Sequence, residues 1–99
     1  MAVKVLITRN FKKNQMNQAH KLLVELRSLV TLRPGYISGQ TLVNADNPNK
    51  VVVVSTWSGR KRWEAWYADP KRKEFSKKLG AFLESPEQTE VFLAGEEIA

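Results

Sequence analysis

The sequence predicts an α+β domain in which helices cover one face of a four-stranded antiparallel sheet. Segments with alternating or valine-rich apolar residues, typical of strands, are interleaved with segments whose apolar residues recur every three or four positions, typical of helices. Their order along the chain is β-α-β-β-α-(α)-β, which is the order of the split βαβ, or ferredoxin-like, arrangement. The 99 residues are therefore expected to form one domain, residues 1 to 99.

The N-terminal third of the chain supplies one strand and one long helix. Residues 3 to 10 alternate between a strongly apolar set and a mixed set, which predicts a strand. Residues 14 to 32 carry apolar side chains at helical spacing, and Pro34-Gly35 should end this helix.

A β-hairpin is expected next. Residues 36 to 44 and 50 to 57 have strand-like composition, and Asp46-Asn47-Pro48-Asn49 between them consists of residues suited to turns. Two strands joined in this way lie antiparallel to each other.

Two helices should follow the hairpin. Ser58 is a candidate N-cap for a short helix that runs to about Ala68. Asp69 then has the carboxylate of an N-cap, and Pro70 suits the first position of a new helix.

The C-terminal segment is expected to complete the sheet. The apolar face of the last helix would comprise Phe75, Leu79, Phe82 and Leu83. Ser85-Pro86 should end that helix, and residues 89 to 94 then supply the fourth strand.

Four consecutive valines, residues 51 to 54, indicate that both faces of the sheet are apolar. Their side chains point alternately to the two faces, and helices can cover only one of them. An exposed apolar sheet face calls for a partner. We therefore expect a homodimer in which two sheets pack together.

Composition excludes several kinds of site. The chain has no cysteine, which rules out disulfides, thiolate catalysis and cysteine metal sites. His20 is the single histidine, so a histidine-built metal site is not expected, and neither Ser38 nor Ser55 has a histidine base placed by spacing. No apolar run approaches the ~20 residues needed to span a bilayer, and the start lacks the features of a signal peptide. A cytoplasmic protein without a membrane partner is expected.

Positive charge is concentrated in one region. The net charge is +6, and half of the 16 Lys and Arg residues lie between positions 60 and 78. RNA-recognition modules share the element order and a basic character, but they stack bases on aromatic residues of the central strands. Here the third strand carries valines, and the basic clusters at 60–62 and 71–73 fall on helices. We expect a solvated rim that favours anionic ligands, and RNA binding stays a distant alternative.

An aromatic cluster follows the third strand. Trp63, Trp66 and Tyr67 stand at i, i+3 and i+4 and so share one face of a helix. Such a face is often simply core, and that alternative stays open. Each ring can bury ~150–250 Å², which is generous for a small core, and aromatic walls with a few polar groups are typical of small-molecule sites. Trp66 and Trp63 are therefore expected to line a pocket for a small aromatic ligand.

Three motifs together resemble the antibiotic biosynthesis monooxygenase (ABM) family. They are the turn Pro34-Gly35-Tyr36, the end of the third strand Ser55-Thr56-Trp57, and Trp63-Glu64-Ala65-Trp66 on the helix. The likeness covers almost the whole chain. It implies a dimeric α+β barrel, with the sheets of two ferredoxin-like subunits packed together, and a pocket between helices and sheet in each subunit.

The resemblance also implies an activity and candidate residues. Some members oxidise anthrones and quinols with dioxygen and no cofactor, so that the protein orients the substrate and stabilises developing charge. Trp66, Trp63 and Tyr36 would be wall and stacking groups, while Arg9 could pair with a phenolate and Asn44 could donate a hydrogen bond. The alternative for Arg9 and Asn44 is exposure at strand ends, and no catalytic base is assigned.

A second branch of the family degrades haem with an asparagine on strand one, a tryptophan on the helix and an axial histidine ten residues beyond it. Trp66 matches the tryptophan, but Ser76 stands in place of the histidine and cannot ligate iron as histidine does. Asn10 falls on the strand face opposite Arg9. We therefore expect no cofactor, and haem degradation stays a disfavoured alternative. A ligand-binding dimer without catalysis is the alternative to a cofactor-independent monooxygenase.

Overall fold

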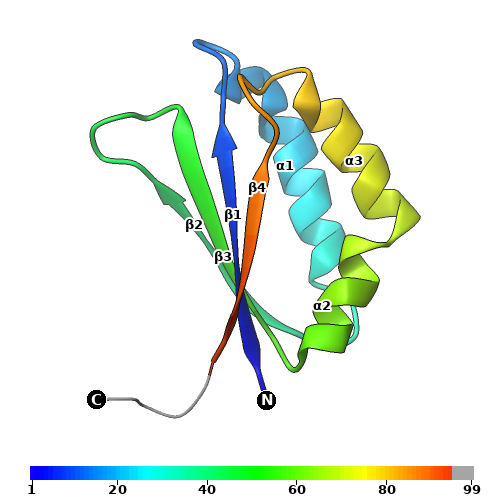
Figure 1. Ribbon diagram of the computed structural model, residues 1–99. Helices are drawn as coiled ribbons and strands as arrows, with labels where there is room; N and C mark the ends of the chain where they lie inside the picture. The colour runs from blue at the N-terminus through cyan, green and yellow to red at the C-terminus, as the bar shows by residue number, and fades with distance from the viewer. Residues whose placement is uncertain (95–99) are drawn as a thin grey trace.

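The computed structural model describes residues 1 to 94, which form a four-stranded sheet and three helices (Figure 1). In chain order the elements are β1 Val3–Asn10, α1 Met16–Val30, β2 Tyr36–Val43, β3 Lys50–Trp57, α2 Arg60–Tyr67, α3 Pro70–Gly80 and β4 Gln88–Leu93. The strand order in the sheet is β2-β3-β1-β4, and each neighbouring pair is antiparallel. All three helices lie on one face of the sheet (Figure 1). The predicted α+β, ferredoxin-like fold is confirmed.

The pairing register brings one apolar set of side chains under the helices. Directly paired residues share a face of the sheet, and Val5 of β1 pairs with Ser55 of β3 and with Val91 of β4. Val3, Val5 and Trp57 on this inner face are fully buried. Because β1 and β3 are the two central strands, their inner residues form the floor of the core, and the alternation seen in the N-terminal segment is explained.

The last helix is shorter than the sequence pattern predicts. The pattern places Phe82 and Leu83 on its apolar face, whereas α3 ends at Gly80. The chain then tightens, so that the Leu83 N–H donates to the Gly80 carbonyl three residues back at 3.3 Å. This turn lets Leu83 form an isolated bridge with Phe11 just beyond β1, and both side chains are buried.

The two short helices begin differently. Asp69 caps α3 as predicted, since its side chain accepts a hydrogen bond from the Lys71 N–H at 2.8 Å, with proline at the first helical position. For α2 the prediction of a Ser58 cap is wrong, because Gly59 is the N-cap residue and no side chain caps the helix. The Ser58 N–H donates to the Gly35 carbonyl at 2.7 Å, which ties the residue to the turn before β2.

The face of the sheet away from the helices is also partly apolar. Its apolar members are Leu6, Val52 and Val54, which are half-buried in the single chain, and Leu42 and Phe92, which are exposed. The valines of β3 therefore do point to both faces. The outward residues of β1 and β3 include no aromatic ring, unlike the base-stacking strands of RNA-recognition modules. The homodimer stays a prediction.

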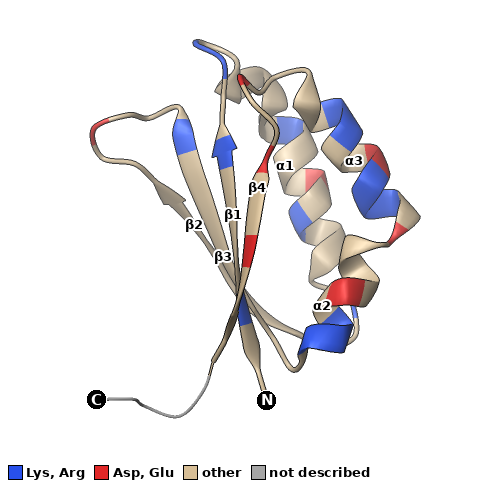
Figure 2. Cartoon of the chain, in the orientation of Figure 1, with Lys and Arg blue, Asp and Glu red and all other residues tan. Residues whose placement is uncertain are grey.

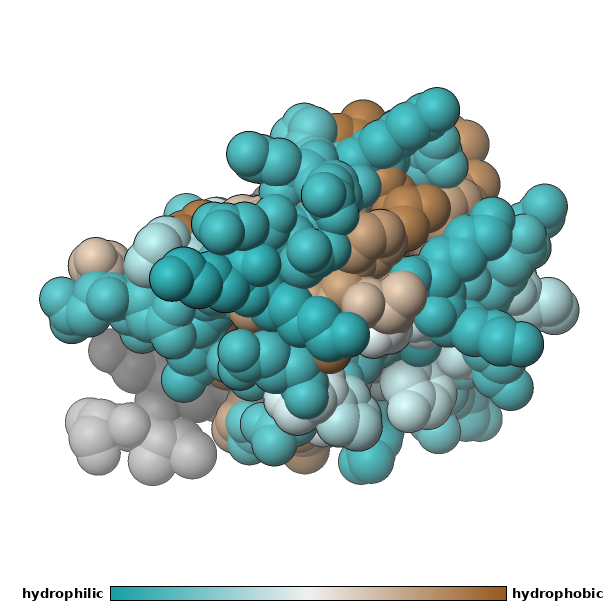
Figure 3. Space-filling model, turned by 90° about the horizontal axis from the view of Figure 1, so that it is seen from above, coloured by the Kyte–Doolittle hydropathy of each residue, from teal (hydrophilic) through white to brown (hydrophobic). Residues whose placement is uncertain are grey.

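The surface combines a basic rim with apolar areas. Figure 2 shows Lys and Arg spread over α2 and α3, and Arg60, Lys61 and Arg62 are exposed there, as a solvated rim requires. Arg72 is the exception within the basic clusters, because it is buried. Seen from above, hydrophobic side chains show between hydrophilic ones (Figure 3). Across residues 1 to 94, none of the helices has the length and apolar character to cross a membrane.

Candidate functional site

A cavity of about 250 Å³ lies between the inner face of the sheet and the helices. Strands β1, β2 and β3 supply one wall, and α1, α2 and α3 supply the other. Most of its lining is aliphatic or aromatic, with a few polar and charged groups. Sites for drug-sized ligands usually measure about 300–1,000 Å³. This cavity therefore suits a small, flat molecule.

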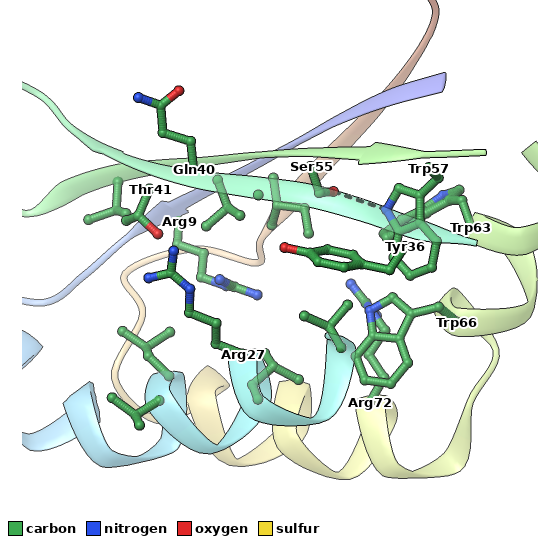
Figure 4. A pocket seen from close by; sticks show the side chains of 18 of the residues that line it. Arg9, Arg27, Tyr36, Gln40, Thr41, Ser55, Trp57, Trp63, Trp66 and Arg72 are labelled. Atoms are coloured by element: carbon green, nitrogen blue, oxygen red, sulfur yellow. Dashed lines mark hydrogen bonds between the residues drawn. The ribbon is translucent and has the colours of Figure 1, made fainter. Parts of the chain in front are cut away.

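Four aromatic side chains close one end of the cavity. Trp57 is central among them, with its ring centroid 5.3 Å from Tyr36 and 5.8 Å from Trp63, both in edge-to-face geometry. Tyr36 from β2 and Trp66 from α2 lie on opposite sides of this end (Figure 4). Three of the sequence candidates, Trp66, Trp63 and Tyr36, thus belong to the lining.

Three residues with hydroxyl groups line the strand wall, Tyr36, Thr41 and Ser55. The Trp57 indole Nε1–H donates to Ser55 Oγ at 3.1 Å (Figure 4), so the Ser55 proton is directed elsewhere. Gly39 pairs with Ser55 across the sheet, and a side chain at Gly39 would collide with the Tyr36 hydroxyl. The missing side chain of Gly39 therefore makes room for the Tyr36 hydroxyl beside Ser55.

A buried charge cluster forms the other polar feature of the site. Arg9 and Arg72 are each only 4% exposed, and both line the cavity. The Arg9 Nε donates to Glu87 Oε2 at 2.9 Å, and the Arg72 Nη2 donates to Glu87 Oε1 at 2.9 Å. The Ser76 hydroxyl donates to the same Oε1 at 3.3 Å. One carboxylate thus holds two guanidinium groups that come from β1 and α3.

The cluster leaves one positive charge beside the cavity. Burial alone would raise the pKa of Glu87, but the charges of Arg9 and Arg72 and their hydrogen bonds outweigh it and hold that pKa below its usual value. Glu87 is therefore ionised at neutral pH and neutralises one of its two arginines. A positive charge next to an apolar cavity favours an anion more strongly than the same charge in water.

Cation–π contacts fix the aromatic end to the helices. The Arg72 guanidinium lies 4.6 Å from the Tyr67 ring centroid and 5.6 Å from that of Trp63. The Arg33 guanidinium lies 5.2 Å from the Trp66 ring centroid and forms an ion pair with Asp69 at 3.3 Å. These contacts restrain the tryptophans that face the cavity.

The other two site candidates from the sequence, Arg9 and Asn44, lie in different places. Arg9 is not exposed at a strand end but buried in the cavity wall. Asn44 is exposed outside the cavity, and its Oδ1 accepts the N–H groups of Asp46 and Asn47 at 2.9 and 2.8 Å. Its side chain shapes the hairpin turn and is not placed to donate to a ligand in this cavity. His20 is exposed, as expected, and lies at the edge of the lining.

Sequence reasoning missed Arg72 and Glu87. Arg72 stands in a run of basic residues typical of a solvated rim, although it lies three and seven residues before Phe75 and Leu79 on the apolar face of α3. That position on the stripe is the signal for burial. Glu87 gives no such signal, because it follows Ser85-Pro86 in an irregular segment before β4.

The residues do not fit the haem site of the second branch. Ser76, at the place of the axial histidine, is occupied as a donor to Glu87. Asn10 pairs with Lys50 and stands on the opposite parity of β1 from Arg9, away from the cavity. Between residues 1 and 94, no group of three or more His, Cys, Asp or Glu side chains could hold a metal ion.

Replacing the shared carboxylate tests the charge cluster. Glu87→Gln should lower the free energy of unfolding by about 3 kcal/mol at pH 7, because two buried arginines lose their counter-charge. The folded pKa of Glu87 lies below its ordinary value of 4.5. Its contribution is therefore complete above about pH 4.5 and is lost as the pH falls through the lowered folded pKa.

Urea unfolding of wild type and variant between pH 3 and pH 8 measures this difference. The exposed Glu25→Gln on α1 is the matched control and should change stability little at any pH. A wild-type to Glu87→Gln difference that stays constant down to pH 3 would contradict the ionic role of Glu87.

Comparison with known proteins places this arrangement in a family. A conserved protein from Methanosarcina mazei Go1 superimposes with a TM-score of 0.87 at 15% identity, over 93% of this chain and 91% of the other. SnoaB from Streptomyces nogalater, a cofactor-independent oxygenase, gives 0.84 at 14% identity over 98% and 96%. Rv0793 from Mycobacterium tuberculosis gives 0.86 at 16% identity over the full length of both chains. No curated protein matches the sequence. The family model described as antibiotic biosynthesis monooxygenase matches residues 2–78, and the chain belongs to that family.

Proposed function

We propose that this protein is a cofactor-independent monooxygenase that oxidises a small polycyclic anthrone or quinol with dioxygen. The observation that carries the proposal is a buried cluster beside an aromatic-walled cavity. In this cluster Glu87 neutralises only one of the two arginines, Arg9 and Arg72, so that a net positive charge is left. Membership of the ABM family and the similar fold of SnoaB, a cofactor-independent oxygenase, support it.

The reaction needs no external reductant when the substrate is an anthrone. Its methylene carbon loses a proton, and the resulting enolate passes an electron to dioxygen. The two radicals combine into a peroxide anion at that carbon, which takes back one proton to become a hydroperoxide. Loss of water then leaves a carbonyl group. One methylene and one dioxygen therefore give one carbonyl and one water. The step that a protein can accelerate is formation of the anion, because charge develops there.

The side chains of the cavity suit these tasks. Trp66 and Tyr36, on opposite sides of the aromatic end, would hold a flat ring system between them and so orient it. Arg9 and Arg72 would stabilise the substrate oxyanion without reorganising, since Glu87 fixes both guanidinium groups. The Ser55 hydroxyl, oriented by the Trp57 indole, would add a neutral donor.

We also propose that a second copy of the chain covers the outer face of the sheet. This apolar face, with Leu6, Val52 and Val54 at its centre, is unpartnered in the single chain. A dimer with the sheets packed together would bury it on both copies and leave the two cavities on the outside of the barrel.

Oxygen uptake tests the activity. With anthrone and with a 1,4-naphthohydroquinone, wild type should consume dioxygen well above the rate of autoxidation. Trp66→Ala should lose at least about tenfold in kcat/KM because the wall against the substrate is gone, while Trp66→Phe should retain most of the rate. Far-UV circular dichroism verifies that both variants are folded. Uptake by wild type no faster than autoxidation with either substrate would favour a ligand-binding protein without catalysis.

Sedimentation equilibrium tests the dimer. Wild type should have twice the mass of one chain, and Val54→Lys should be monomeric, because a lysine ammonium at the centre of the sheet interface would be buried without a partner. Leu32→Lys is the control, since Leu32 is 81% exposed and lies outside the sheet. A monomeric wild type, or a Val54→Lys variant that remains dimeric, would show that the sheets do not pack together.

A further inference from the structure

A third arginine reaches the cavity from the helix side. Arg27 of α1 and Arg9 of β1 extend from opposite walls toward the same part of the cavity (Figure 4). Arg9 is paired with Glu87, whereas Arg27 has no acidic partner within 4.0 Å among residues 1 to 94. Three arginines and one carboxylate therefore leave two positive charges around the cavity. Two like charges that approach each other are unfavourable until an anion lies between them.

The guanidinium groups still have donors to offer. Arg9 uses its Nε for Glu87, and its two terminal nitrogens make no hydrogen bond within the described part of the chain. Within residues 1 to 94, only one fully buried side-chain nitrogen or oxygen atom lacks a hydrogen-bond partner, and it is the Nε of Arg33. The terminal nitrogens of Arg9 also lack a partner, so they are not fully buried. They are open to the cavity that Arg9 lines. Arg27 is exposed as a residue and stands at the rim, where a ligand would enter.

A carboxylate matches this pair of groups. Its two oxygens lie in one plane and accept N–H bonds from guanidinium groups in a fixed geometry, and such charge-assisted bonds are about twice as strong as neutral ones. The aromatic end of the cavity, with Trp66 and Tyr36, lies away from Arg27 along the cavity (Figure 4). A ligand that satisfies both ends has a flat ring system at one end and a carboxylate at the other.

We propose that the natural ligand is an aromatic carboxylic acid, bound with its carboxylate between Arg27 and Arg9 and its rings at the aromatic end. This inference deepens the proposed function and rests on it for the reaction, since the acid group would be a permanent charge in addition to the oxygen that ionises during oxidation. Arg27 is then a specificity-determining residue that selects acids over neutral ring systems of equal size.

Calorimetric titration with two probes of equal ring size tests the inference. At pH 7 and low salt, 2-naphthoate should bind at least about tenfold more tightly than neutral 2-naphthol, a difference of about 1.4 kcal/mol. Arg27→Gln should reduce this preference to about threefold or less while leaving the affinity for 2-naphthol unchanged. Arg60→Gln on α2, an exposed arginine outside the cavity lining, should change neither affinity.

Each other result overturns the inference. Equal affinity for the two probes would show that the arginines do not select an acid. Loss of both affinities in Arg27→Gln would show a structural role only, and absence of binding by either probe at millimolar concentration would reject the cavity as an acid site.

The two proposals can fail separately. Because 2-naphthoate carries no oxidisable hydroxyl, its binding does not depend on oxygen chemistry. Selective binding of 2-naphthoate without oxygen uptake on any quinol would reject the oxygenase and keep the acid site. Rapid oxidation of neutral quinols with no preference for 2-naphthoate over 2-naphthol would keep the oxygenase and reject the acid site.

Discussion

The site depends on one carboxylate that holds two buried arginines. Without Glu87, Arg9 and Arg72 would face each other as two uncompensated charges in the core, and burial of that kind costs several kcal/mol. With Glu87 ionised, the pair is held in place and one positive charge is left over. The ion pairs also connect β1, α3 and the segment before β4, so the charge of the cavity and the packing of the fold are set by the same contacts.

The aromatic residues complete the site by closing one end of the cavity. Trp57 is fully buried and central, and its neighbours extend from it toward the cavity in edge-to-face contacts. Trp63 and Trp66 are thus both buried core residues and part of the cavity wall, so their spacing fits both positions at once. Low polarity around the arginines strengthens their attraction for an anion. In the proposed function, the aromatic wall and the positive charge would act together on a flat, electron-rich ligand.

Much of the fold was predictable, because periodic apolar residues and turn residues specify the elements and their order. The alternation of β1, the hairpin and the Asp69 cap all follow from local chemistry. The end of α3 did not, since Leu83 leaves the helix to pair with Phe11, a contact between residues far apart in sequence. The charge cluster of the site could not be predicted either, because it too is formed by residues that are far apart in sequence. Arg72 and Glu87 look like surface charges until the fold places the Glu87 carboxylate between Arg9 and Arg72.

Whether the cavity stabilises an anion is the central claim, and it is tested most directly by the acidity of a bound phenol. The ionisation of 2-naphthol, followed by absorbance during a pH titration with saturating protein, reports its pKa in the cavity. If the positive charge of Arg9 and Arg72 outweighs the desolvation of the phenolate by the apolar lining, the pKa of the bound phenol should fall by about one pH unit or more relative to free 2-naphthol. If the apolar lining dominates, that pKa should be unchanged or raised, and this result would contradict the account.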